Sequence, residues 1–208
     1  MTLAFLDDQR FILKRDIPLE VALFFLAFFL VVVALAVWGY RAGGSKGEGV
    51  IRATSAVLSV LGLGVAGYIA YKTQIDKGSF QCIGGGGGCE LVEQSKYANF
   101  LGVHMSIWGL IGYTTILAAA LSKGDLARLA AFGLALFGFI VSLILRYLEL
   151  WQIHASCQWC VASAVLMTSL LVLATCRLVG FYGLDGYDDE MSGEPDAEGS
   201  GDPAPETA

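Results

Sequence analysis

The sequence predicts an all-α membrane protein, with a four-helix transmembrane bundle as its core and one extra N-terminal transmembrane helix. Three observations lead to this fold class. The chain of 208 residues is 56% hydrophobic and only 15% charged, whereas soluble domains carry about 25% charged residues. The apolar residues gather in long uncharged runs, which is typical of membrane-spanning segments. The runs also lack the alternating pattern of a transmembrane β-barrel, so helices must satisfy the backbone in lipid.

Five runs are each near the ~20 residues that a helix needs to cross a hydrocarbon core of about 30 Å. They cover residues 21–40, 53–71, 103–122, 129–145 and 150–176, and in the last we expect the helix at about 157–180. The first run is longer than the apolar part of most signal peptides. We therefore expect it to span the membrane, with a cleaved signal as the alternative. Glycine and alanine recur inside the runs, and such small residues let helices approach closely in lipid.

The chain divides into three predicted parts. Residues 1–48 form an N-terminal arm and the extra transmembrane helix. Residues 49–181 form the four-helix core, with a long outer loop at 72–102. Residues 182–208 form an acidic tail that contains nine Asp and Glu residues and no Lys or Arg. A segment of this composition cannot bury a core, so we expect the tail to be disordered.

Four cysteines form two pairs that are predicted to face the same side of the membrane. Cys82 and Cys89 flank a glycine-rich stretch of the outer loop, and Cys157 and Cys160 open the last run. Two runs separate the pairs, so the chain crosses twice and returns to the same face. Short positive loops favour the cytoplasm. We expect a multi-pass protein of the cytoplasmic (inner) membrane, with its cysteines on the extracytoplasmic face and its acidic tail inside. The face opposite the cysteines is the richer in positive charge, with Arg41, Lys46, Arg52, Lys123, Arg128 and Arg177. The N-terminal arm, which also contains basic residues and would lie on the cysteine side, is an exception.

The spacing of the second pair, SCQWC at 156–160, is typical of thiol–disulfide exchange at the start of a helix. The helix N-terminus stabilises the thiolate of Cys157. Cys160 lies one turn deeper, at the edge of the hydrocarbon, where an apolar acceptor such as a quinone dissolves. Exchange proceeds through a mixed disulfide, so the flexible glycines between Cys82 and Cys89 let a sulfur travel between partners. The alternatives are structural disulfides, or zinc bound by all four cysteines; we expect no metal.

Two longer segments carry a resemblance. CELVEQSKYANFLGVHMSIWGLIGY at 89–113 and CQWCVASAVLM at 157–167 resemble the bacterial homologues of vitamin K epoxide reductase. The resemblance covers roughly residues 51–181. It includes the four-helix core, a cysteine pair in the outer loop, a serine after that pair, an S-x-W-G turn and the C-x-x-C motif.

The resemblance implies a membrane thiol oxidoreductase that supports disulfide bond formation. Members of this family oxidise a thioredoxin-fold partner and pass the electrons to a membrane quinone such as menaquinone or ubiquinone. By position, Cys89 is expected to exchange with the partner, Cys82 to pass electrons to Cys157, and Cys160 to face the quinone. Ser95 matches a loop serine or threonine that is linked to activity, within a segment, 90–101, expected to form a short amphipathic helix.

Five further residues are predicted near the quinone: His104, Met105, Ser106, Trp108 and Ala164. Animal enzymes have Asn and Tyr in place of Met105 and Ala164, so quinone-epoxide reduction is the less favoured alternative. The other alternative is a non-enzymatic membrane module with structural cysteines. Only the acidic tail follows the core, so the expected partner is a separate DsbA-type protein. We expect no nucleic-acid partner.

Overall fold

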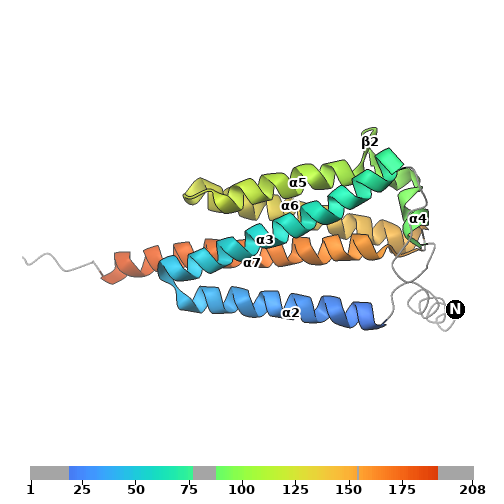
Figure 1. Ribbon diagram of the computed structural model, residues 1–208. Helices are drawn as coiled ribbons and strands as arrows, with labels where there is room; N and C mark the ends of the chain where they lie inside the picture. The colour runs from blue at the N-terminus through green and yellow to red at the C-terminus, as the bar shows by residue number, and fades with distance from the viewer. Residues whose placement is uncertain (1–18, 77–87, 154, 192–208) are drawn as a thin grey trace, which may run out of the picture.

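The computed structural model describes residues 19–76, 88–153 and 155–191, and these are almost entirely helical. This confirms the predicted all-α membrane bundle. Within the described residues, four helices are long and apolar enough to cross a membrane, and a fifth of 17 residues is also apolar. These five helices are α2 (Leu19–Ala42), α3 (Gly44–Tyr71), α5 (Met105–Leu121, the helix of 17 residues), α6 (Asp125–Leu148) and α7 (Gln158–Met191) (Figure 1).

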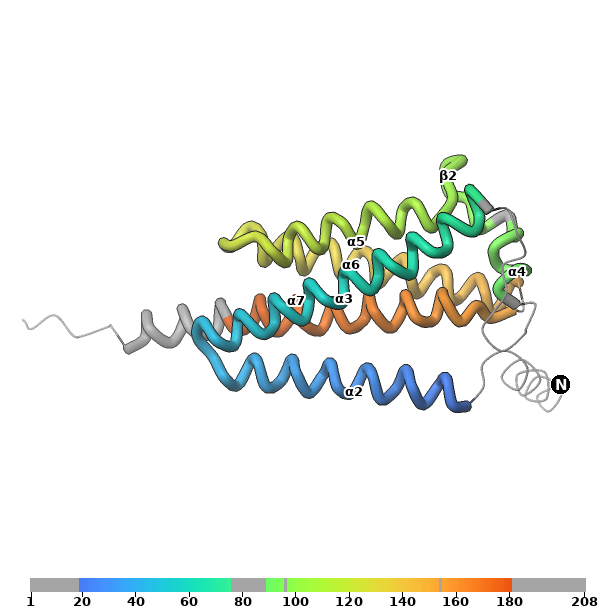
Figure 2. The backbone as a smooth tube through the Cα atoms, viewed as in Figure 1, coloured from blue at the N-terminus to red at the C-terminus, as the bar shows by residue number. Residues whose placement is uncertain are grey.

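Helices α3, α5, α6 and α7 form the bundle, and α2 lies along its outer edge against α3 and α7 (Figure 2). All five contribute to one buried cluster, for example through Ala36, Leu58, Tyr113, Ala135 and Leu173. Many large apolar side chains point outward instead. Lipid tails are as apolar as leucine, so this exposure suits a bundle that is surrounded by lipid.

Two helices extend furthest beyond the apolar runs that predict them. Helix α3 begins at Gly44, because glycines let the polar start of the helix pack against α2: a Cβ on Gly47 would lie 2.2 Å from the Gly39 carbonyl oxygen. Helix α7 continues to Met191, into the segment expected to be disordered. Hydropathy does not mark this end, and the sequence has no helix-breaking proline between Gln158 and Met191.

The outer loop folds over one end of the bundle. Helices α3 and α6 each pass into a π-helical turn, η1 (Lys72–Asp76) and η3 (Glu149–Ile153). Helix α4 (Gly88–Glu93) crosses this end (Figure 1) and is followed by a 3-10 turn, η2 (Lys96–Ala98). Strands β1 (Asn99–Phe100) and β2 (Val103–His104) then pair as a small antiparallel hairpin.

The predicted amphipathic helix over 90–101 is therefore wrong beyond Glu93. The chain reverses at Leu101 and Gly102, whose φ angles are +53° and +76°. Positive φ at both central residues is typical of a tight hairpin turn and incompatible with a continuing helix. Val92 and Ala98 of this segment are buried, whereas Leu91 and Leu101 are 60% and 78% exposed, so its apolar residues do not form one buried helical face.

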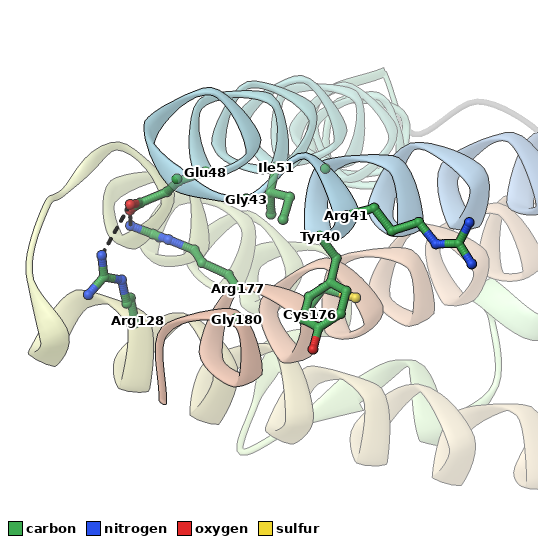
Figure 3. Close-up of a pocket in the computed structure, with 11 residues that line it drawn as sticks. Tyr40, Arg41, Gly43, Glu48, Ile51, Arg128, Cys176, Arg177 and Gly180 are labelled. Carbon is green, nitrogen blue, oxygen red and sulfur yellow. Dashed lines mark hydrogen bonds and ion pairs between the residues drawn. The ribbon is translucent and has the colours of Figure 1, made fainter. Parts of the chain in front are cut away.

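A charge cluster ties the helices together at the opposite end. Glu48 on α3 lies between Arg128 on α6 and Arg177 on α7 (Figure 3), at 3.1 and 3.3 Å. Arg52 on α3 donates from Nε to the Ala120 carbonyl oxygen of α5 at 3.1 Å. These contacts link the four bundle helices beside a cavity of about 400 Å³, far from the cysteine end.

The contact between α3 and α5 gives a prediction about stability. A Cβ on Gly62 would lie 2.2 Å from the ring of Tyr113, which is 1% exposed and anchored to the Ser163 hydroxyl at 2.9 Å. Because the ring cannot retreat, we expect Gly62→Ala to destabilise the protein by about 1–3 kcal/mol. Thermal unfolding in detergent measures this loss. Gly64→Ala is the control, because nothing lies within 4 Å of its Cβ position; equal effects of the two changes would contradict the packing described here.

Candidate active site

Three of the predicted redox cysteines meet at the end of the bundle that the outer loop covers. Cys89 of α4 and Cys157, which precedes α7, are 0% and 1% exposed and share one buried cluster with Val92 and Ala155. Cys160 of α7 packs against this cluster. The segment before α7 and the short helix α4 therefore place one loop cysteine beside the C-x-x-C pair. Cys82 lies outside the described residues.

The cysteines at this end differ in redox state. Cys89 is disulfide-bonded, whereas Cys157 and Cys160 are free thiols. Because Cys89 is fully buried, an incoming protein thiol cannot reach its sulfur in this arrangement. Among the residues that the structure describes, no group of three or more His, Cys, Asp or Glu side chains is placed to hold a metal ion.

The environment of Cys157 favours its thiolate. A hydrogen bond from the Cys160 thiol lowers the pKa of Cys157 below the ordinary thiol value, and the backbone N–H groups of Cys160 and Trp159 act in the same direction. Burial and the negative charge of Glu149 oppose this effect. A lowered pKa increases the fraction of the nucleophilic form near neutral pH. Cys157 is thus prepared for attack on a disulfide.

A cavity of about 130 Å³ adjoins Cys160 and extends between α3, α5 and α6. Its wall is largely apolar, with a few polar side chains among the lining residues. A mostly apolar pocket with a few placed polar groups is typical of a small-molecule site. The apolar lining includes Val65, Ala66, Ile69, Val92, Met105, Leu145, Leu148 and Ile153, and the polar lining includes Glu93, His104, Ser106, Arg146, Glu149 and Ser163.

A row of polar contacts runs along one wall of this cavity. The Nε2 atom of His104 lies 2.7 Å from Oε1 of Glu93, and its Nδ1 atom lies 2.7 Å from Oγ of Ser106. Nδ1 also accepts the backbone N–H of Ser106 at 3.3 Å, so the other ring nitrogen, Nε2, is the one that faces Glu93. His104 caps α5 through this contact. The Ser106 hydroxyl is thereby fixed at the cavity wall.

A buried ion pair occupies the other wall. Glu149, whose side chain is 3% exposed, pairs with Arg146 one turn earlier. Arg146 also donates from Nη2 to the Ser156 hydroxyl at 3.3 Å. The Glu149 carboxylate lies beside the Cys160 thiol and the Cys157 backbone N–H, and Glu149 and Cys160 line the same cavity. This ion pair therefore connects the end of α6 to the C-x-x-C motif.

The cavity includes some of the predicted quinone neighbours and not others. Ser95, His104, Met105, Ser106 and Cys160 line it; the Ser95 hydroxyl donates to the Val92 carbonyl at 2.7 Å, which fixes the turn after α4.

Two predicted neighbours lie outside the cavity lining. Trp108 is 41% exposed and donates from Nε1 to the Phe100 carbonyl at 3.3 Å, so it anchors the β1–β2 hairpin. Ala164 is one turn beyond Cys160 on α7, and its carbonyl accepts the Thr168 hydroxyl.

Three charged residues of the site were not among the predicted site residues: Glu93, Arg146 and Glu149. Charged residues at the end of an apolar run are costly in a membrane and often functional, so Arg146 and Glu149 carried a usable signal. Glu93 carried none, because it resembles any other acid of a polar loop. Only the fold brings it to His104.

The fold and the site together define a multi-pass helical membrane protein in which paired cysteines adjoin an apolar cavity. The model of the Vitamin K epoxide reductase family matches residues 53–175, which is more than half of the chain. The protein belongs to this family. It is therefore a membrane redox enzyme, an oxidoreductase of the thiol and quinone kind.

Proposed function

We propose that this protein is a quinone-dependent thiol:disulfide oxidoreductase. It oxidises a separate thioredoxin-fold protein of the DsbA type and passes two electrons through its cysteines to menaquinone or ubiquinone. The single observation that supports this most is the placement of Cys89, Cys157 and Cys160 in one cluster beside a largely apolar cavity. We place these cysteines on the extracytoplasmic face, where disulfides persist.

The burial of Cys89 sets the order of the relay in this proposal. Cys89 packs with Cys157 and is fully buried, so it is the loop cysteine that passes electrons to Cys157. Cys82 is then the sulfur that the partner protein attacks. This reverses the roles that the family resemblance implies for the two loop cysteines. Each transfer is a thiol–disulfide exchange through a mixed disulfide.

The last transfer runs from the C-x-x-C pair to the quinone. The Cys157 and Cys160 thiols are oxidised to a disulfide, and the quinone takes up two electrons and two protons to become a quinol. Cys160 lines the cavity, while Cys157 is buried behind it. Cys160 is therefore the sulfur that faces the acceptor.

The cavity fits the ring of a quinone in chemistry better than in size. Its apolar wall suits a ring that dissolves in lipid, and the Ser106 hydroxyl lies on that wall, where it can turn from Nδ1 of His104 to donate to a quinone oxygen. Its volume of about 130 Å³ is below the ~300–1,000 Å³ of common ligand pockets. We therefore expect the ring to bind as the surrounding side chains move outward, with its tail in the lipid.

The same site supports quinone-epoxide reduction less well. Met105 lines the cavity and its thioether offers no hydrogen-bond donor, and Ala164 is not part of the lining. A thiol oxidase needs no more than an apolar ring site beside Cys160. The cysteine cluster and the family membership also argue against a non-enzymatic module.

A steady-state assay tests the proposed function. The purified protein in detergent receives a reduced DsbA-type protein and a soluble quinone, and quinone absorbance is followed with time. We expect quinone loss that requires both the thiol protein and Cys157. If quinone is not consumed and the partner stays reduced, the proposal is wrong, and turnover of a quinone epoxide by the same preparation would favour the alternative.

Ser106 is expected to bind the quinone through one hydrogen bond. Removing the hydroxyl in Ser106→Ala removes about 0.5–1.5 kcal/mol of binding, so the KM for quinone should rise roughly 2- to 10-fold with little change in kcat. Thr114→Ala is a suitable control, because that hydroxyl bonds only to its own helix at the Leu110 carbonyl. An unchanged KM in Ser106→Ala would place the quinone elsewhere.

A further inference from the structure

The Arg146–Glu149 ion pair has no evident structural necessity. Both residues come from the apolar end of α6 and the π turn that follows it. Burying such charges costs several kcal/mol, and a well-packed apolar pair is often at least as stable. A carboxylate that is 2% exposed in a membrane protein is therefore more readily explained by chemistry than by stability.

The surroundings of Glu149 point to that chemistry. Glu149 and Cys160 line the same cavity, and the Glu149 carboxylate lies beside the Cys160 thiol. Arg146 is the cation beside it. The other titratable groups that line this cavity are Tyr97 and the pair of Glu93 and His104 on the opposite wall. Glu149 is thus the acid that is in contact with a redox-active sulfur.

We propose that Glu149 is a catalytic proton acceptor that takes the proton of the Cys160 thiol during quinone reduction and delivers it to a quinone oxygen. This inference rests on the proposed function and assigns one of its proton transfers. Arg146 acts as a positioning residue, because its guanidinium pairs with the Glu149 carboxylate and holds it beside Cys160.

The step balances in atoms and electrons. The Cys157 and Cys160 S–H bonds break, one S–S bond forms between the two sulfurs, and the electron pair passes to the quinone. Its two oxygens gain one proton each. One of these protons comes from Cys160 through Glu149. The second balances the proton that Cys157 releases when it forms its thiolate. The lowered pKa of Cys157 favours this release.

Glu149→Gln tests the proposal, because glutamine keeps the shape and hydrogen bonding of the side chain but cannot accept the thiol proton. A pre-reduced protein is mixed with excess quinone under anaerobic conditions, and the rate of the single oxidation is measured against pH. Loss of general base catalysis costs about 10²–10⁴-fold, so we expect a fall of this size at neutral pH with little change in quinone affinity. The variant's rate should then rise with pH, as hydroxide generates the Cys160 thiolate.

A second readout separates this role from a structural one. The charge of Glu149 raises the pKa of Cys157, so Glu149→Gln should move the Cys157 titration, followed by thiolate absorbance, to lower pH. Glu149→Asp keeps the carboxylate and should recover part of the rate. Glu48→Gln is the matched control, because it removes an acid that pairs with arginines at the far end of the bundle, and it should leave the rate unchanged.

The outcomes are distinct. Glutamine can leave Arg146 unpaired and impair folding, so thermal unfolding is measured for each variant, and Arg146→Met/Glu149→Gln serves as the uncharged replacement. A folded Glu149→Gln or double variant with the wild-type rate and pH profile overturns the inference while the proposed function stands. If the wild-type protein itself fails to reduce quinone, the proposed function fails instead.

Discussion

Replacing Cys160 by alanine should abolish quinone reduction and trap a disulfide between Cys89 and Cys157. Without Cys160 no sulfur faces the acceptor, so turnover should fall on the order of 10⁶-fold, the scale seen when an essential nucleophile is removed. The Cys157 thiolate, whose pKa is lowered, still attacks the disulfide of Cys89, which shares its buried cluster, and displaces the other sulfur of that bond as a thiolate. Cys160 is then missing as the thiol that resolves this bond.

Peptide mapping under non-reducing conditions identifies the trapped bond. A Cys89–Cys157 crosslink is the expected result, and a Cys82–Cys157 crosslink would restore the order that the family resemblance implies. Cys176→Ala is the control, because Cys176 is a free thiol at the opposite end of the bundle beside Tyr40 and Arg177. It should turn over at the wild-type rate. Normal quinone reduction by Cys160→Ala would contradict the relay altogether.

Replacing both loop cysteines should separate the two halves of the relay. The Cys82→Ala/Cys89→Ala protein has no sulfur that can exchange with a protein partner, so oxidation of a DsbA-type protein should fall to background. A small dithiol such as dithiothreitol reaches the partly exposed Cys160 region directly, so quinone reduction driven by it should persist. The two rates are measured in the same preparation with each donor in turn.

The control for this prediction is Cys157→Ala, which should lose quinone reduction with both donors. If the double variant still oxidises the protein partner at the normal rate, the loop cysteines are not the entry point. If it loses activity with both donors while remaining folded, the loop pair takes part in the quinone step as well.

The bundle was predictable because its physical cause is local in the sequence. A run such as 129–145 is apolar over its whole length, and only a helix satisfies its backbone in lipid. The ends of the helices were less predictable, since contacts rather than hydropathy set them. Helix α3 extends back to Gly44 because Gly47 packs against Gly39 of α2, a close approach that no run of apolar residues reveals.

The sequence predicted the redox cysteines of the site, but it did not predict the acidic and basic residues that lie beside them. The C-x-x-C spacing alone indicates thiol–disulfide chemistry, because two sulfurs at that spacing at the start of a helix are within bonding reach. The Glu93–His104 contact joins the end of α4 to the hairpin before α5, and it exists only because the loop folds back at Leu101. The role of Glu149 likewise depends on which thiol lies beside it in space.

Counting quinols in a single turnover tests the central claim most directly. The protein is fully reduced, freed of reductant, and mixed with excess quinone under anaerobic conditions without any partner. If both cysteine pairs feed the quinone, each wild-type chain should yield two quinols and lose four thiols. The Cys82→Ala/Cys89→Ala protein should yield one quinol and lose two thiols, and the Cys157→Ala protein none. Quinol formation without matching thiol loss, or full thiol retention in the wild-type protein, would contradict the proposed relay.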